Sequence, residues 1–229
     1  MKHSGRARKA AFKILLFSLI AAVAIWVIGF VVSVVGTIVG VIAVPVLVVL
    51  WIIFALFTFY FFRDPTARPP AEASLVVSPG HGKVDAIGAT TEPKFMGGDC
   101  QRVSIFLSVF DVHVQNAPVS GKAAFFEYTE GQFLNALRAE SAVHNENLLL
   151  GFEAAEPRGE KVGVRLIAGV LARRIVSYVT AGEEVARGER ISLIQFGSRV
   201  DVYLSARAKV KVKLGDRVVG GETVVAAFD

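Results

Sequence analysis

A serine and three histidines are the residues of this chain best suited to nucleophilic and acid–base chemistry. Ser198 follows Gly197 at the start of a β-branched run, and His81, His113 and His144 lie in three separate segments. An imidazole titrates near neutral pH, so it can take up or return a proton. Taken alone, however, a Gly-Ser pair is typical of a turn, and a lone histidine is usually a structural hydrogen-bonding group. The neighbouring residues must therefore decide whether these side chains do chemistry.

Several other kinds of site are excluded by residue spacing. Gly197-Ser198 does not lie in a Gly-x-Ser-x-Gly sequence, the nucleophile elbow of many hydrolases. The four histidines and the single cysteine, Cys100, show no metal-ligand spacing, so we expect no metal. The chain also lacks a phosphate-binding P-loop and a Gly-x-Gly-x-x-Gly sequence after a strand.

A long apolar stretch near the N-terminus predicts attachment to a membrane. Hydrophobic residues make up 53% of the chain, and no charged residue or histidine occurs from Ile14 to Phe62. One helical span needs about 20 apolar residues, so this stretch is long enough for two. It is too long for a signal peptide, and we expect it to be retained. Small and turn-forming residues at 34–40 predict a hairpin of two helices, over 14–34 and 41–62. The alternative is one span plus a re-entrant or interfacial segment broken at Pro45.

The charge distribution predicts which side of the membrane the chain occupies. The net charge is +5, and the basic residues before the apolar stretch account for it: Lys2, Arg6, Arg8, Lys9 and Lys13. Arg63 and Arg68 follow the stretch. Basic flanks stay in the cytoplasm, so we expect a cytoplasmic tail (1–13), a transmembrane hairpin (14–62) and a soluble part on the cytoplasmic face of the cell membrane. The remaining residues are balanced in charge, which argues against nucleic-acid binding.

The soluble part has the pattern of a mainly β domain. A proline-rich linker (63–73) precedes short β-branched or alternating runs at 74–78, 102–107, 161–167, 190–194, 200–204 and 208–214. One helix is expected over Gln132–Ala142. Gly182–Glu189 and Gly215–Glu222 share the pattern G-[DE]-x-V-x-x-G-E, which is similar to turns in biotinyl- and lipoyl-carrier β-sandwiches. No carrier lysine accompanies the repeat, so we interpret it as structural and predict a β-sandwich or barrel-like domain over 74–229.

Four segments, in this order, resemble the phosphatidylserine decarboxylase family in its short, membrane-tethered form. They are FFRDP at 61–65, SPGHGKV at 78–84, DVHVQNAPVSG at 111–121 and FGSRVDVYL at 196–204, with further similarity at 145–147 and 172–175. The resemblance implies a self-processing enzyme cut between Gly197 and Ser198. The serine hydroxyl attacks the preceding carbonyl to give an ester, β-elimination splits the chain, and residue 198 becomes a pyruvoyl group. The products would be a β chain (1–197) and an α chain (198–229) that stay associated, as a single pair or as a homo-oligomer of that pair.

The same resemblance implies the reaction and its residues. A Schiff base between the pyruvoyl ketone and the substrate amine would support decarboxylation of phosphatidylserine to phosphatidylethanolamine, without a metal or pyridoxal phosphate. His113 is then the acid–base residue. Asn116 and Arg63 are candidates for substrate contact, although Arg63 equally serves as the basic flank. The lipid tails of the substrate are not predicted by any feature of the sequence.

His81 departs from the family pattern. The usual motif is Ser-Pro-Ala-Asp-Gly, whose aspartate helps to activate the serine, and here Gly80-His81 replaces Ala-Asp. Two interpretations compete: His81 is itself the base, or the protein is a non-catalytic, membrane-tethered relative that binds lipid or a partner. We favour retained activity, because Gly197-Ser198 and His113 are present. Asp85 and Asp111 are alternative sources of the carboxylate.

Overall fold

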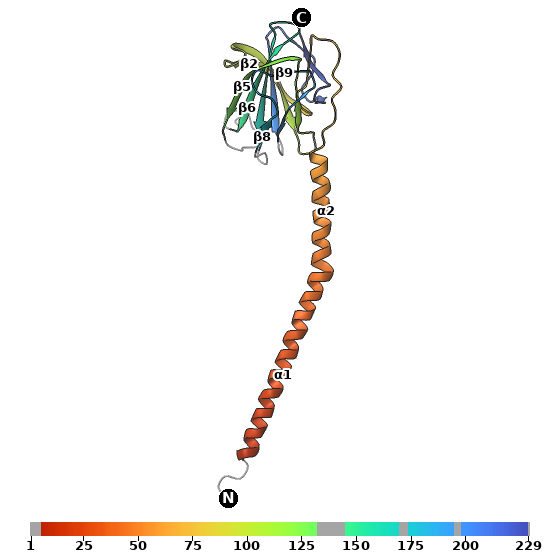
Figure 1. Cartoon of the computed structure of the whole chain (residues 1–229), viewed down its shortest axis with the longest axis vertical. Coiled ribbons are helices and arrows are strands. Elements are labelled where there is room, and N and C mark those ends of the chain that lie inside the picture. The colour runs from red at the N-terminus through yellow and green to blue at the C-terminus, as the bar shows by residue number, and fades with distance from the viewer. Residues whose placement is uncertain (1–5, 132–144, 170–173, 195–197, 229) are drawn as a thin grey trace. The chain divides into compact units, whose positions relative to one another are not determined.

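The computed structural model describes residues 6–131, 145–169, 174–194 and 198–228. The chain divides into two compact units, Met1–Thr58 and Phe59–Asp229. The first is helical and the second is built of β-strands (Figure 1). The predicted helix over 132–142 lies outside the described residues.

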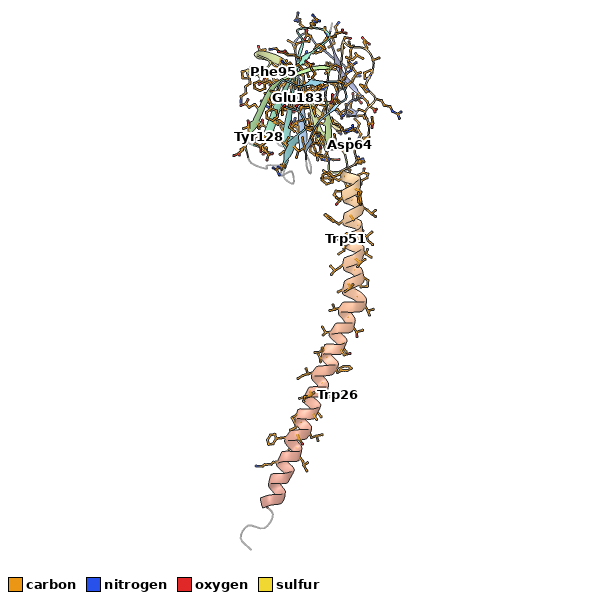
Figure 2. The ribbon with its side chains drawn as sticks, in the orientation of Figure 1. Trp26, Trp51, Asp64, Phe95, Tyr128 and Glu183 are labelled. Atoms are coloured by element: carbon orange, nitrogen blue, oxygen red, sulfur yellow. The ribbon has the colours of Figure 1, made fainter. Side chains whose placement is uncertain are left out.

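The apolar stretch forms a continuous helical segment. Helix α1 (Arg6–Ile38) leads through the π-helical η1 (Val39–Ala43) into α2 (Val44–Phe61). Leu15–Phe61, 47 residues with a mean hydropathy of 3.0, is long and apolar enough to cross a membrane. Most of its side chains are exposed, including Trp26 and Trp51, which project from the helix in Figure 2, whereas its last residue, Phe61, is buried. A helix that is apolar all round is suited to lipid rather than to water.

The structure differs from the predicted hairpin at this point. Residues 34–40 form no turn, and the small residues there are accommodated within the helix, where Thr37 Oγ1 donates to the carbonyl of Ser33 at 2.9 Å. Pro45 lies in the first turn of α2, and its ring would clash with the carbonyl four residues earlier in a regular α-helix. The wider π-helical turn η1 directly precedes it and relieves that clash without ending the helix.

In the part of the second unit that the structure describes, there are fourteen strands. Their bounds are β1 Leu75–Val77, β2 Gly82–Glu92, β3 Gly98–Leu107, β4 Val114–Asn116, β5 Gly121–Thr129, β6 Asn147–Ala154, β7 Lys161–Ala168, β8 Ile175–Ser177, β9 Glu184–Val185, β10 Arg190–Ile194, β11 Ser198–Leu204, β12 Lys209–Val210, β13 Arg217–Val218 and β14 Val224–Ala227. The predicted mainly β domain is confirmed. Five of the six predicted runs contain a strand of similar extent, whereas the run at 208–214 contains only the two residues of β12.

The strands form three antiparallel sheets whose pairing pattern occurs twice. The large sheet has the order β13-β2-β3-β11-β7-β6-β5-β9, and the small sheets are β1-β14-β12 and β4-β10-β8. In the first half β2 pairs with β13 and β3, and β3 pairs with β11. In the second half β5 pairs with β9 and β6, and β6 pairs with β7. The second half is inserted between β3 and β11, and the halves meet where β11 pairs with β7.

The repeated glycine motif lies at equivalent turns of the two halves. Gly188 and Gly221 have φ angles of 81° and 73°, in the left-handed region that favours glycine. Each turn leads into a strand, β10 or β14, as the motif predicts. The backbone of Gly188 donates to the carbonyl of Ala117 at 2.9 Å, and that of Gly221 donates to the carbonyl of Ser78 at 2.7 Å. The repeat therefore holds the end of β4, which contains Asn116, and the loop that carries His81.

One face of the large sheet supplies the core. Alternating residues of the central strands are fully buried there, among them Val103, Ile105, Val200, Val202 and Leu204. Each such side chain stabilises the fold by about 1.5–3 kcal/mol through its removal from water. Strand β11, which begins at the predicted cleavage point, pairs with a neighbouring strand on both sides over its whole length.

The proline-rich segment packs along the β unit and is held there by side chains. Arg190 Nε bonds the carboxylate of Asp64 at 2.6 Å, and the backbone N–H of Arg68 donates to Glu222 at 3.1 Å. The guanidinium of Arg187 donates to the carbonyls of Pro70, Glu72 and Leu75. The predicted linker is therefore an irregular but anchored segment.

Candidate active site

Ser198 is the first residue of β11 and is completely buried. It pairs with Leu107 of β3 and with Ala168 of β7. Its side chain is 0% exposed, and its hydroxyl has no hydrogen-bond partner among the described residues. A buried hydroxyl without a partner costs about 1–3 kcal/mol, so such groups call for a functional explanation.

The strand register places Ser198 at one end of the large sheet. That end also contains Leu107 at the end of β3 and Ala168 at the end of β7, with the β6 residue Asn147 beyond them. The chain continues from Leu107 directly into the loop that carries His113. The topology thus brings a serine and a histidine distant in sequence to the same end of one sheet.

His113 is buried and held in one orientation. Its side chain is 0% exposed, and its ring lies on that of Phe61, with centroids 4.2 Å apart and planes at 32°. Nδ1 lies 2.9 Å from the carbonyl oxygen of Asp111. A carbonyl oxygen can only accept, so Nδ1 carries the proton and Nε2 is the acceptor nitrogen of the ring.

The surroundings of His113 keep its ring neutral. The pKa of His113 is lowered to about 4, mainly by burial and also by the nearby Arg63 and His81, whereas the backbone bond and the charge of Asp111 oppose this shift. At pH 7 the ring is therefore uncharged and able to accept a proton at Nε2.

His81 lies beside Asn116 against the turn at Gly220. A Cβ atom added to Gly220 would be 2.8 Å from Cδ2 of His81 and 2.9 Å from Oδ1 of Asn116, so glycine is required for this packing. Burial lowers the pKa of His81, and Arg63 adds to that effect, whereas Asp111 and Glu222 raise it. Arg63 thus lies close enough to both histidines to lower their pKa values, and His81 lies close enough to lower that of His113.

Asn116 and Arg63, the predicted substrate contacts, both have partners in the protein. The side-chain N–H of Asn116 donates to the carbonyl of Gly188 at 2.8 Å. Arg63 donates to the carbonyls of Tyr60 and Phe110 at 2.8 and 2.7 Å, and its guanidinium lies 4.0 Å from the centroid of the Tyr60 ring. These bonds use only part of the five N–H donors of a guanidinium.

The two aspartates considered as replacements for the missing carboxylate have other partners. Asp111 accepts bonds from the backbone and hydroxyl of Ser108 at 2.8 Å and from Arg217 at 3.0 Å, and it reaches His113 only through its backbone. Asp85 pairs with Arg199 at 3.3 Å, and burial raises the pKa of Asp85. The carboxylate of Asp111 thus bonds Ser108 and Arg217, and that of Asp85 bonds Arg199.

The ion pair of Arg199 was not predicted from the sequence. Arg199 also bonds Asp201 at 3.1 Å, and both side chains are buried. Because alternate residues of a strand face opposite sides, Arg199 and Asp201 lie on the face away from Ser198. The sequence does offer one sign of this pair. Arg199 and Asp201 are two residues apart in the mostly apolar run SRVDVYL, so they lie on the same face of a strand.

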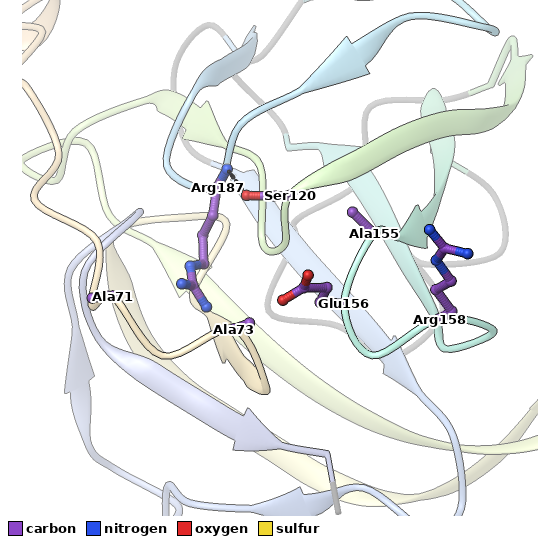
Figure 3. A pocket seen from close by; sticks show the side chains of 7 residues that line it. All are labelled: Ala71, Ala73, Ser120, Ala155, Glu156, Arg158 and Arg187. Atoms are coloured by element: carbon purple, nitrogen blue, oxygen red, sulfur yellow. Dashed lines mark hydrogen bonds between the residues drawn. The ribbon is translucent and has the colours of Figure 1, made fainter.

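Some parts of the predicted site are not described. Gly197 and His144 lie outside the described residues, so the geometry of the 197–198 bond is not part of this structure. A cavity of about 340 Å³ elsewhere in the domain is lined by Arg187, Ser120, Glu156 and Arg158 together with three alanines (Figure 3). It contains none of the predicted site residues. Within the described residues, no cluster of His, Cys, Asp and Glu side chains is suited to a metal ion.

These features define a class of protein: a mainly β domain with a candidate active site, preceded by an apolar helix that is long enough to cross a membrane. The comparison with protein families agrees, because the model of the phosphatidylserine decarboxylase family matches residues 54–226. The chain belongs to this family.

Curated relatives support the assignment. The chain is 46% identical over 171 residues to the phosphatidylserine decarboxylase proenzyme of Symbiobacterium thermophilum, covering 75% of this chain and 79% of the relative. It is 42% identical to the proenzyme of the same name from Syntrophotalea carbinolica, covering 74% and 78%. Among solved structures, glucose permease IIA from Mycoplasma capricolum matches with a TM-score of 0.37 and 18% identity, over 66% of this chain and 93% of that chain. A TM-score of that size does not establish a shared fold.

Proposed function

We propose that this protein cleaves itself between Gly197 and Ser198 and then converts phosphatidylserine to phosphatidylethanolamine with a pyruvoyl group derived from Ser198. The observation that carries the proposal is the buried, unpartnered hydroxyl of Ser198 at the sheet end that leads into the His113 loop. The family membership and the word proenzyme in the relatives' names support it.

His113 is the base that we assign to the cleavage. Its neutral ring, with the proton on Nδ1, has an acceptor at Nε2 for the proton of the Ser198 hydroxyl. The freed oxygen attacks the carbonyl carbon of Gly197, and the acyl group moves from nitrogen to oxygen as an ester. Loss of the Cα proton of residue 198 then expels the Gly197 carboxylate and separates the chains. Water replaces the nitrogen at residue 198, which leaves as ammonia.

His81 assists this chemistry in place of the usual aspartate. His81 lies near enough to His113 to lower the pKa of that residue. The pKa of His81 is itself lowered, so its ring is neutral at pH 7. A neutral imidazole can relay a proton without a carboxylate. The presence of His81 instead of aspartate also motivates the alternative, a non-catalytic relative that binds lipid or a partner. The two interpretations differ in whether His81 takes part in proton transfer.

The substrate is held by its charged headgroup. The pyruvoyl ketone, once formed, supplies the electron-withdrawing group that stabilises the carbon from which CO2 departs. Arg63 offers its remaining guanidinium donors to the phosphate, and the amide of Asn116 offers polar contact beside His81. His113 returns the proton to the substrate carbon after CO2 has left.

The domain works at the cytoplasmic face of the cell membrane. The last turn of α2, with Phe61 against His113, belongs to the same compact unit as the site, so a headgroup need not leave the bilayer surface. Arg63 and Arg68 favour the cytoplasmic side. After cleavage the α chain stays bound, because β11 is paired on both edges.

The test compares two serines of the same strand region. Ser198→Ala should abolish both chain cleavage and the release of CO2 from phosphatidylserine in mixed vesicles. Ser205→Ala is the matched control, because its hydroxyl is also buried without a partner but lies just past the opposite end of β11. It should be cleaved and active. Decarboxylation by Ser198→Ala protein would refute the proposal.

A further inference from the structure

An exposed aromatic side chain lies at the tip of the loop between β3 and β4. Phe110 is 64% exposed, although the residues around it in this loop are half-buried or buried. The loop also carries His113, three residues later. A large apolar side chain held in water beside a candidate active site calls for a partner.

The loop is fixed in this conformation by hydrogen bonds. Asp111 accepts bonds from the backbone and hydroxyl of Ser108, and the backbone N–H of Asp111 donates to the carbonyl of Ser108 at 2.9 Å. The exposure of Phe110 therefore comes from an ordered turn.

The same loop is bonded to the end of the apolar helix. The carbonyl of Phe110 accepts from the hydroxyl of Tyr60 at 3.1 Å and from Arg63 at 2.7 Å. Phe59, in the same turn of α2 as Tyr60, is 79% exposed. The backbone of Phe110 is thus bonded to the end of α2, where the aromatic side chains of Phe59 and Tyr60 are also exposed.

We propose that the loop Ser108–Asp111 is a second membrane contact, at which Phe110 inserts into the interfacial region of a lipid bilayer. Aromatic residues with a neighbouring arginine and tyrosine are typical of that region, since the rings enter the apolar boundary while the polar groups stay among headgroups. The inference rests on the membrane attachment within the proposed function.

The contact would set the height of the active site above the bilayer. Phe110 and His113 belong to one hydrogen-bonded loop, so insertion of Phe110 holds the imidazole near the plane of the headgroups. A serine headgroup then reaches the site while its acyl chains remain in the membrane.

The experiment uses tryptophan fluorescence of the full chain in vesicles of phosphatidylcholine and phosphatidylglycerol. The chain has two tryptophans, and Trp26→Phe with Trp51→Phe removes their signal. Phe110→Trp then places the reporter in the loop. Ala206→Trp is the matched control, because the strand pairing Leu204↔Gln101 puts the turn after Leu204 at the opposite end of the sheet from Ser198↔Leu107.

We expect lipids brominated on their acyl chains to quench the Phe110→Trp reporter and to leave the Ala206→Trp control unquenched. The loop reporter should also emit at shorter wavelength in vesicles than the control does. Equal emission and no quenching for both reporters would overturn the proposal. Because no decarboxylation is measured, this result is independent of whether Ser198 is processed.

Discussion

At the scale of single residues, burial determines what the two histidines can do. His113 is removed from water on the ring of Phe61, and its Nδ1 is committed to the carbonyl of Asp111. His81 shares the positive neighbour Arg63. Both rings therefore favour the neutral state, which is the state a proton acceptor requires at pH 7.

The first prediction concerns the pH dependence of self-cleavage. The pKa of His113 is lowered from the ordinary 6.5 to about 4, so the neutral base persists as the pH falls through 6.5 and is lost only near pH 4. The cleavage rate should stay on a plateau from pH 8 to about 5 and then fall. The appearance of the small chain after a pH jump measures this. An acid limb centred near pH 6.5 would contradict the assigned environment.

The second prediction separates the roles of the two histidines. Removal of a general base slows a reaction by about 10²–10⁴-fold, so His113→Ala should slow cleavage by that order. His81→Ala should also slow cleavage, and His81→Asp, which restores the family's usual residue, should recover much of the rate. Time courses of precursor disappearance provide the measurement. Unchanged cleavage in His81→Ala would remove His81 from the mechanism.

At the scale of elements, the proposed cleavage requires strand β11 to hold its first residue still before and after the chain is cut. Its ladders to β3 and β7 run over its whole length. Arg199, directly after Ser198, adds side-chain bonds to Asp85 beside β3 and to Asp201. Once the bond before Ser198 is broken, these contacts prevent the new strand end from fraying.

The third prediction tests this anchor. Loss of one partner of a buried ion pair costs about 3–5 kcal/mol, because the remaining charge is left buried. Arg199→Met, whose parent side chain is 8% exposed, should lower the free energy of unfolding by that order. The measurement is urea unfolding in detergent, in an uncleaved Ser198→Ala background. The exposed pair of Arg190 and Asp64 is the control, and Arg190→Met should cost less than about 1 kcal/mol. If both variants lost the same free energy of unfolding, the Arg199 ion pair would not be an anchor of β11.

At the scale of the whole molecule, the sequence predicts strands best where β-branched residues are frequent. The predicted run at 200–204 was found as part of β11, although every residue of that strand is buried. Strand β6 was missed because its NLLLGFEA run contains no β-branched residue and does not alternate between apolar and polar residues. The helical hairpin was predicted from small residues at 34–40, yet nothing in an apolar helix forces a turn there.

The site was predictable only in part. Ser198 and His113 were found through the resemblance of ordered segments, and the strand register brings them to one end of a sheet. The contact of His113 with Phe61, the neutral state of the ring and the Arg199 pair depend on side chains that meet only after folding. Spacing along the chain carries no information about such contacts.

The most direct test of the central claim is the intact mass of the purified, folded protein. Self-cleavage predicts two chains, residues 1–197 and a smaller chain that begins at residue 198 with a pyruvoyl group in place of the serine. The smaller chain should lack a free amino terminus. A single, full-length chain of 229 residues in folded protein would contradict the account.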